Sequence, residues 1–137
     1  MSPEVQGFAS GFPLMLLHAG VNLLLLAIGS GAYALLSPNQ EVRRIREGNP
    51  AAAVSLASVV LGLAMPLAAA FAAAASLLEI ELWGVAVSVV ALLIFTLLDF
   101  ALVGLPQRMH EGDVAAAVLL AAARLGVSMI LAAALAV

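Results

Sequence analysis

The chain has 137 residues, of which 65% are hydrophobic and only 9% are charged. A soluble domain of this length could not bury so much apolar surface, so we expect lipid to be its solvent. The formal net charge of −3 and the lack of a basic block argue against nucleic-acid binding. The absence of cysteine excludes disulfides and thiolate metal sites, and we expect no metal and no cofactor.

Four apolar stretches are long enough to cross about 30 Å of hydrocarbon as helices. No basic residue precedes the first stretch, which argues for a retained helix rather than a cleaved signal peptide. Pro38 should end the first span, and Asn49 and Asp113 should cap the second and the fourth. The expected spans are about Pro13 to Leu36, Pro50 to Leu77, Trp83 to Val103, and Val114 to the carboxyl terminus.

One segment of the chain occurs twice, with an offset of 64 residues. Arg44 to Val54 reads RIREGNPAAAV, and Arg108 to Val118 reads RMHEGDVAAAV. From Arg44 to Ala70, 16 of 27 positions are identical to their partners. Each repeat therefore predicts one helical hairpin, about 13–77 and 83–137. Both hairpins should point the same way, related by an axis along the membrane normal. The predicted fold is an all-α integral membrane domain of four helices over residues 1–137.

The charges predict how this domain sits in the membrane. The loops after the first and third spans hold four arginines. On the opposite side, before the first span and between the second and third, the charged residues are all acidic: Glu4, Glu79 and Glu81. The positive-inside rule then places both repeated loops in the cytoplasm and both termini outside, as in a bacterial cytoplasmic membrane. The loops serve as helix starts and contacts to anionic lipid, or alternatively as a docking surface for a partner. The loop residues concerned are Arg43, Arg44, Arg46, Glu47, Arg108, His110 and Glu111.

The repeated loop and the helices after it resemble a known family. The residues that carry the resemblance are Glu41, Ile45, Glu47-Gly48-Asn49, Ala51 to Ala53, Leu61 to Ala68, Trp83-Gly84 and the Ala-rich final helix. Over roughly Ala34 to Ala136 the chain is similar to domain-of-unknown-function family 350, the YjfL-like small bacterial membrane proteins. The resemblance implies a four-span inner-membrane protein and supplies neither an activity nor a site residue.

Two charges fall inside the expected spans. Asp99 should lean toward the bilayer centre and Arg124 back toward the cytoplasmic face, so their side chains should converge in depth. A lone charge there would cost at least about 2.5–3.5 kcal/mol on insertion scales. The pair fixes helix register, or it belongs to a proton or ion pathway, or it contacts another subunit. Helical spacing places Gly84, Ser88, Thr96 and Asp99 on one side of span three, and Ala117, Ala121, Arg124 and Ser128 on one side of span four.

Four further residues of the first two spans are candidates for packing or function. His18 and Asn22 are four apart on the first span and form either a polar site or interhelical hydrogen bonds, of which the second is favoured. Tyr33 near the end of this span suits the membrane interface. Pro66 removes a hydrogen bond to Gly62 and should kink the second span, either for packing alone or as a hinge.

These features favour a protein without catalytic activity. The chain offers scattered serines and one intramembrane histidine, and no nucleophile–base motif or metal-ligand set. We expect a membrane subunit or scaffold that forms oligomers through small-residue faces, and whose partners are lipid and copies of itself or another membrane protein. The alternative is a small ion or proton channel or transporter that uses Asp99 and Arg124.

Overall fold

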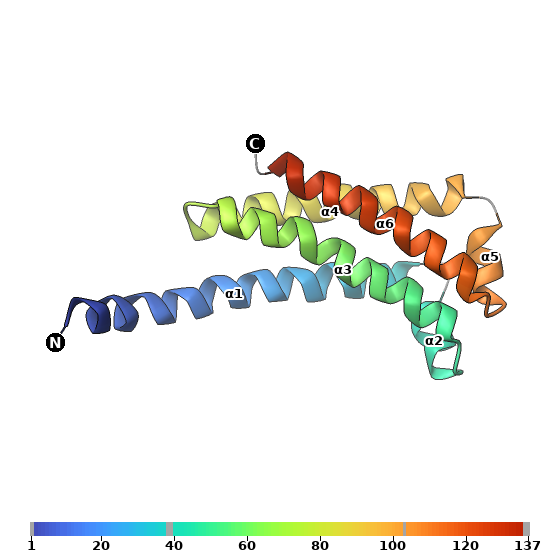
Figure 1. The fold of residues 1–137 in the computed structure, drawn as a ribbon, viewed down its shortest axis with the longest axis horizontal. Coiled ribbons are helices and arrows are strands. Elements are labelled where there is room, and N and C mark those ends of the chain that lie inside the picture. Colours follow the sequence, from blue (N-terminus) through green and yellow to red (C-terminus); the bar gives the residue numbers. More distant parts are fainter. Residues whose placement is uncertain (1, 38–39, 103, 136–137) are drawn as a thin grey trace.

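The structure is a computed structural model that describes residues 2–37, 40–102 and 104–135 (Figure 1). Over these residues the chain is helical, and four of the helices are long and apolar enough to cross a membrane, as predicted. Pro38, expected to stop the first span, and the predicted span ends at Val103 and Val137 lie outside the described residues, whereas the predicted end at Leu36 is confirmed. The elements are α1 (Pro3–Leu36), α2 (Glu41–Arg46), α3 (Pro50–Ala73), α4 (Leu77–Ala101), α5 (Leu105–His110) and α6 (Val114–Leu135).

The first helix begins earlier than predicted. The Ser2 hydroxyl accepts a hydrogen bond from the Val5 amide at 3.4 Å, and Glu4 lies in the first turn, where the helix dipole favours an acid. Pro13, the predicted start, lies inside the helix instead. The prediction was wrong because a proline inside a membrane-spanning helix removes one backbone hydrogen bond without ending the helix.

The connection between α3 and α4 is also tighter than predicted. Helix α3 ends at Ala73 rather than Leu77, and α4 begins at Leu77 rather than Trp83. The Ser76 hydroxyl accepts from the Glu79 amide at 3.3 Å, while the Glu79 carboxylate accepts from the Ala75 amide at 2.9 Å. This reciprocal capping recruits the residues before Trp83 into the first turns of α4.

Each repeated loop contains a short helix that the sequence did not reveal. Helices α2 and α5 are both followed by a glycine with positive φ, 85° at Gly48 and 89° at Gly112. The amide after each glycine, at Asn49 or Asp113, reaches back to the carbonyl of Arg44 or Arg108, at 2.9 Å and 3.0 Å. These are the bonds of a Schellman motif. The Glu-Gly-Asn and Glu-Gly-Asp segments therefore end one helix and start the next.

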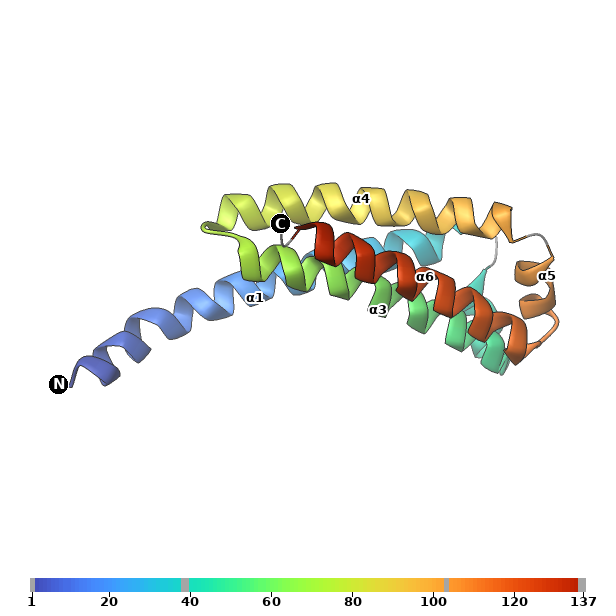
Figure 2. The ribbon, with the colours of Figure 1, turned by 45° about the horizontal axis from the view of Figure 1, so that its top comes forward.

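Helices α3 and α6 make the most extensive contact in the bundle, and α1 and α4 flank them. This is the arrangement expected from the small side chains of α3 and α6. In the first helix only Gly29 and Tyr33 are buried. Helices α2 and α5 lie at one end of the bundle, while the start of α1, the end of α6 and the α3–α4 connection lie toward the other (Figures 1 and 2). The first part of α1 projects beyond that connection.

Candidate functional site

A fully buried arginine organises the end of the bundle near α2 and α5. Nη2 of Arg124 donates to Oδ1 of Asp99 at 2.9 Å and to the hydroxyl of Tyr33 at 2.6 Å. Nη1 donates to the backbone carbonyl and the hydroxyl of Ser55, at 2.9 Å and 2.7 Å, and to the hydroxyl of Ser58 at 3.2 Å. One guanidinium thus links α1, α3, α4 and α6, which offsets the cost of placing a charge among apolar helices.

A second carboxylate reaches the same cluster from α2. Glu41 is 0% exposed, and its Oε1 accepts from the Ser55 hydroxyl at 2.8 Å and from the Tyr33 hydroxyl at 3.4 Å. Burial raises the pKa of Glu41 above its ordinary value of 4.5, although the Ser55 hydrogen bond and the Arg124 charge act in the opposite direction. We call Tyr33, Glu41, Ser55, Ser58, Asp99 and Arg124 the Arg124 network.

The Tyr33 hydroxyl stands between the two carboxylates of this network. It lies 3.3 Å from Oδ2 of Asp99 and 3.4 Å from Oε1 of Glu41, but a hydroxyl has a single proton to donate. With both carboxylates ionised, the two negative charges exceed the one positive charge of Arg124. A proton on Glu41 makes the network neutral and supplies the missing donor. The geometry therefore stabilises the protonated form of Glu41 relative to that of an exposed glutamate.

The Arg124 network is built at positions where the two sequence repeats differ. Every network residue has an apolar residue at the position 64 residues away in the chain. The pairs are Tyr33 and Leu97, Glu41 and Leu105, Ser55 and Leu119, Ser58 and Ala122, Asp99 and Leu35, and Arg124 and Val60. Both halves of the chain contribute, so neither half could assemble this network by itself.

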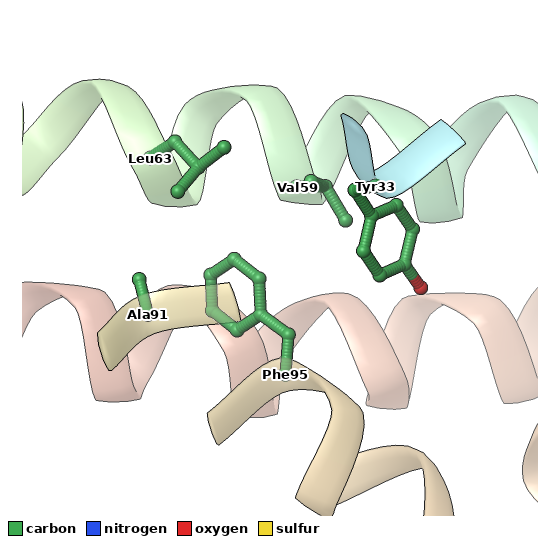
Figure 3. Packing of buried hydrophobic residues seen from close by; sticks show 5 residues of the cluster. All are labelled: Tyr33, Val59, Leu63, Ala91 and Phe95. Atoms are coloured by element: carbon green, nitrogen blue, oxygen red, sulfur yellow. The ribbon is translucent and has the colours of Figure 1, made fainter. Parts of the chain in front are cut away.

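An apolar cluster closes the network on the side of the bundle centre. It consists of Tyr33, Val59, Leu63, Ala91 and Phe95, none of which is more than 6% exposed. In Figure 3 the Tyr33 hydroxyl points away from the other four side chains. The tyrosine ring thus belongs to the core while its oxygen belongs to the network, a role that the sequence did not predict.

A cleft reaches the network from outside. It holds about 280 Å³ between α1 and α4, and its lining includes Leu36, Leu92, Thr96, Asp99 and Phe100. The Asp99 side chain is 16% exposed, whereas its partner Arg124 is 0% exposed. The carboxylate therefore has one face toward the buried arginine and one toward the cleft.

The other polar residues predicted on the fourth and sixth helices have different surroundings. Ser88 is buried on α4, but its hydroxyl has no hydrogen-bond partner among the described residues. Ser128 is buried on α6 and donates to the Arg124 carbonyl at 2.9 Å. Thr96 was predicted to face inward, and this prediction is wrong: it is exposed, and its hydroxyl donates to the Leu92 carbonyl at 2.9 Å. Its helical angle carries it to the rim of the cleft instead.

His18, Asn22 and Pro66 lie away from the Arg124 network. Nδ2 of Asn22 donates to the backbone carbonyl of Leu67 at 3.3 Å, which is the interhelical hydrogen bond favoured from the sequence. The His18 ring packs edge-on against Phe71, with ring centroids 6.3 Å apart. Pro66 is buried, and α3 continues through it to Ala73. His18 and Asn22 thus join α1 to α3.

The predicted loop residues connect α2 and α5 to each other. Nη1 of Arg44 donates to the His110 carbonyl at 3.3 Å. Nδ2 of Asn49 donates to the carbonyls of Met109 and His110 at 3.3 Å and 3.2 Å, while its Oδ1 caps α3. Burial, with the nearby Arg44 charge, lowers the pKa of His110. The loops thus form one surface at the end of the bundle.

The remaining loop charges lie on the outside of this surface. Arg43 and Glu47 form an exposed ion pair at 3.2 Å. Arg108 pairs with Asp113 at 2.6 Å, and Asp113 also accepts from the Ala116 amide at 3.2 Å, as expected of a cap. Arg46 and Glu111 are exposed.

The sequence predictions missed most of the Arg124 network. They paired Asp99 with Arg124, but they gave no site role to Glu41, Tyr33, Ser55 or Ser58. The signal was present, because each of these residues is polar where the other repeat is apolar. Among the described residues, no three histidines or carboxylates gather as they would around a metal ion.

Comparison with known proteins gives a family and no function. No curated protein and no solved structure matches the chain. The family model described as Domain of Unknown Function (DUF350) matches residues 7–135, which is nearly the whole chain and includes every residue of the Arg124 network. This chain of four membrane-spanning-type helices therefore belongs to the DUF350 family.

Proposed function

We propose that this chain is a non-catalytic, multi-pass subunit of the bacterial cytoplasmic membrane that assembles with copies of itself. The observation that carries the proposal is the Arg124 network. Its residues come from five helices of the same chain and are joined by hydrogen bonds, and the apolar cluster around Phe95 closes it on the inner side. Such an arrangement suits the stable assembly of helices better than the passage of a substrate.

The proposed topology has two parallel hairpins, with α2 and α5 in the cytoplasm and both termini outside. It is supported by Arg43, Arg44, Arg46 and Arg108 at one end and by acidic residues at the other. Since the chain has no cysteine of its own, labelling of a single introduced cysteine reports on which side of the membrane that position lies. In intact spheroplasts, a membrane-impermeant maleimide should label Glu81→Cys and spare Glu111→Cys. The reverse pattern would refute this orientation.

Self-association is proposed through the outer face of α6. Ala122 and Gly126 are exposed one helical turn apart, and a side chain added at Gly126 would meet nothing within 4 Å. Small residues with this spacing let two helices approach closely in lipid. Together with the basic surface of α2 and α5, which can contact anionic lipid or a partner, this face suits a scaffold.

The test is disulfide cross-linking in native membranes. Gly126→Cys should yield oxidised dimers, and the bulky Ala122→Leu should reduce their amount when combined with it. Leu93 on α4 is also exposed, at 61%, so Leu93→Cys is the matched control and should stay monomeric. Equal cross-linking at both cysteines would indicate random collision and would contradict the α6 interface.

A small ion or proton channel or transporter remains the second candidate, and the cleft at Asp99 is the observation that favours it. Purified protein in liposomes should show no proton or cation flux above that of empty vesicles if the scaffold proposal is right. Robust flux that Asp99→Asn abolishes, with the variant still folded, would replace the scaffold proposal by this one.

A further inference from the structure

The cleft between α1 and α4 has the chemistry of a small amphiphile site. At about 280 Å³ it is close to the lower limit of small-molecule pockets. We propose that it binds the primary ammonium group of an amphiphilic amine, with the Asp99 carboxylate as the anionic contact and the apolar lining around the tail. The amine is either a lipid headgroup, as in phosphatidylethanolamine, or a free alkylamine.

The lining supports an ammonium group rather than an anion or a neutral head. Asp99 is the charged residue of the described lining, and Tyr33 and Thr96 are polar residues of the same lining. The Thr96 proton is engaged with the Leu92 carbonyl, so its oxygen is left as an acceptor. A primary ammonium has three donors for such acceptors. An anion would meet the Asp99 carboxylate as a like charge.

The other lining residues fit an apolar tail. Leu36, Leu92 and Phe100 border the cleft, and Leu36 and Phe100 are 83% and 74% exposed. In a membrane these side chains face acyl chains, so a tail bound in the cleft continues into lipid. The cleft therefore separates a polar floor at Asp99 from an apolar mouth, which matches the two ends of an amphiphilic amine.

The charge of the Arg124 network adds a second argument. Two carboxylates and one guanidinium carry one excess negative charge when Glu41 is ionised. An ammonium at Asp99 neutralises this charge, and so does a proton on Glu41. The groups that face Glu41 are Tyr33 from α1, Ser55 from α3, Asp99 from α4 and Arg124 from α6. Amine binding and protonation of Glu41 should therefore compete, and affinity should fall as pH is lowered.

The first experiment measures thermal unfolding of the full chain in a mild non-ionic detergent, with n-hexylammonium as the probe. Hexylammonium should raise the melting temperature saturably, while hexan-1-ol and hexanoate should not. Leu36→Trp, which fills the cleft, should abolish the shift. Its neighbour Leu35, 87% exposed and outside the lining, gives the control Leu35→Trp, which should respond like the natural chain. Equal shifts from hexan-1-ol, or an unaltered response in Leu36→Trp, would overturn the proposal.

The second experiment tests the charge argument. Glu41→Gln keeps an acceptor for Ser55 but removes the negative charge that Glu41 carries at high pH, so it should weaken hexylammonium binding at high pH and flatten its pH dependence. Unchanged affinity and pH dependence in this variant would refute the competition with a proton.

The source of the amine is decided by native mass spectrometry from nanodiscs that contain phosphatidylethanolamine and phosphatidylcholine. Selective retention of phosphatidylethanolamine, lost in Leu36→Trp, identifies a lipid. Hexylammonium binding without such retention identifies a free amine. The absence of both signals would overturn the proposed site. The result is separable from self-association, because Leu36 lies on α1 and the proposed interface lies on α6.

Discussion

Helices α2 and α5 occupy equivalent places in the two sequence repeats, yet α2 buries an acidic side chain in the bundle and α5 buries an apolar one. Both have six residues, and both end in a glycine with positive φ and a Schellman motif. Helix α2 buries Glu41, which joins the Arg124 network. Helix α5 buries Met109, which packs in an apolar cluster with Ala51, Ala117 and Leu120.

Two kinds of residue can therefore be distinguished: those that fix the path of the backbone, and those whose side chains fill the interior. The shared positions Gly48 and Gly112, with the caps Asn49 and Asp113, give both loops the same path. The interior side chains were free to diverge because their backbone was already set by these local bonds. A repeated framework with unlike interior residues is therefore the feature to test.

The largest effect is expected from the centre of the Arg124 network. Arg124→Leu leaves two buried carboxylates without their cation and should cost about 3–5 kcal/mol of stability. The measurement is the unfolding midpoint in mixed detergent, together with the yield of monodisperse protein. The triple variant Glu41→Leu, Asp99→Leu and Arg124→Val installs the residues of the other repeat and buries no charge. It should recover most of the loss, and a triple variant as unstable as the single one would contradict the network.

A smaller effect is expected where the repeats share a glycine but not its surroundings. A methyl group at Gly62 would lie 2.8 Å from the Phe95 ring and 2.9 Å from the Ser128 hydroxyl. Gly62→Ala should therefore cost about 1–3 kcal/mol through overpacking. Its equivalent Gly126 meets nothing within 4 Å in its own chain, so in the detergent-solubilised monomer Gly126→Ala should be neutral or stabilise α6 by up to about 1 kcal/mol. Equal melting temperatures for both variants would argue against the close contact at Gly62.

The cap positions should give a still smaller difference. Asn49→Asp keeps the cap on α3 but loses the donor to the Met109 and His110 carbonyls, at about 1 kcal/mol for each hydrogen bond. It also places a negative charge near the last carbonyls of α5. The reverse change, Asp113→Asn, keeps a good cap and loses only the ion pair with Arg108, so it should alter the melting temperature less. The opposite ranking would contradict the bond from Asn49 to α5.

The smallest effect is the pH dependence of stability near α2. Because the pKa of Glu41 is raised on folding, its contribution is fully present below the unfolded value of about 4.5 and is lost as pH rises through the folded value. His110, with a lowered pKa, acts in the opposite direction, and so does Asp113, whose pKa is lowered chiefly by the Ala116 amide and the Arg108 hydrogen bond. The difference in unfolding free energy between the natural chain and Glu41→Gln, measured across pH, isolates the contribution of Glu41. Parallel pH profiles would show that Glu41 does not titrate in this window.

The sequence predicted the four long helices, because runs of apolar residues fix them almost regardless of detail. It did not predict α2 and α5, since six residues without a clear apolar period give little signal for a helix. For the same reason Glu41 was not predicted to be buried. It was expected to lie in a loop, but in α2 its side chain faces the bundle. Asp99 and Arg124 were accessible to prediction because charges are rare inside spans. Serine and tyrosine are common there, so Ser55, Ser58 and Tyr33 were not.

The one-sided bonds of Asn49 have a consequence for how the two halves recognise each other. Its amide donates to the end of α5, whereas Asp113 has no donor to return toward α2. Glu41 and Ser55 likewise come from the first half, and Asp99 and Arg124 from the second. Two first halves would bring acids without the arginine, and two second halves would lack the serine and tyrosine that hold it. The halves are therefore complementary rather than interchangeable, like the two subunits of an obligate heterodimer joined in one chain.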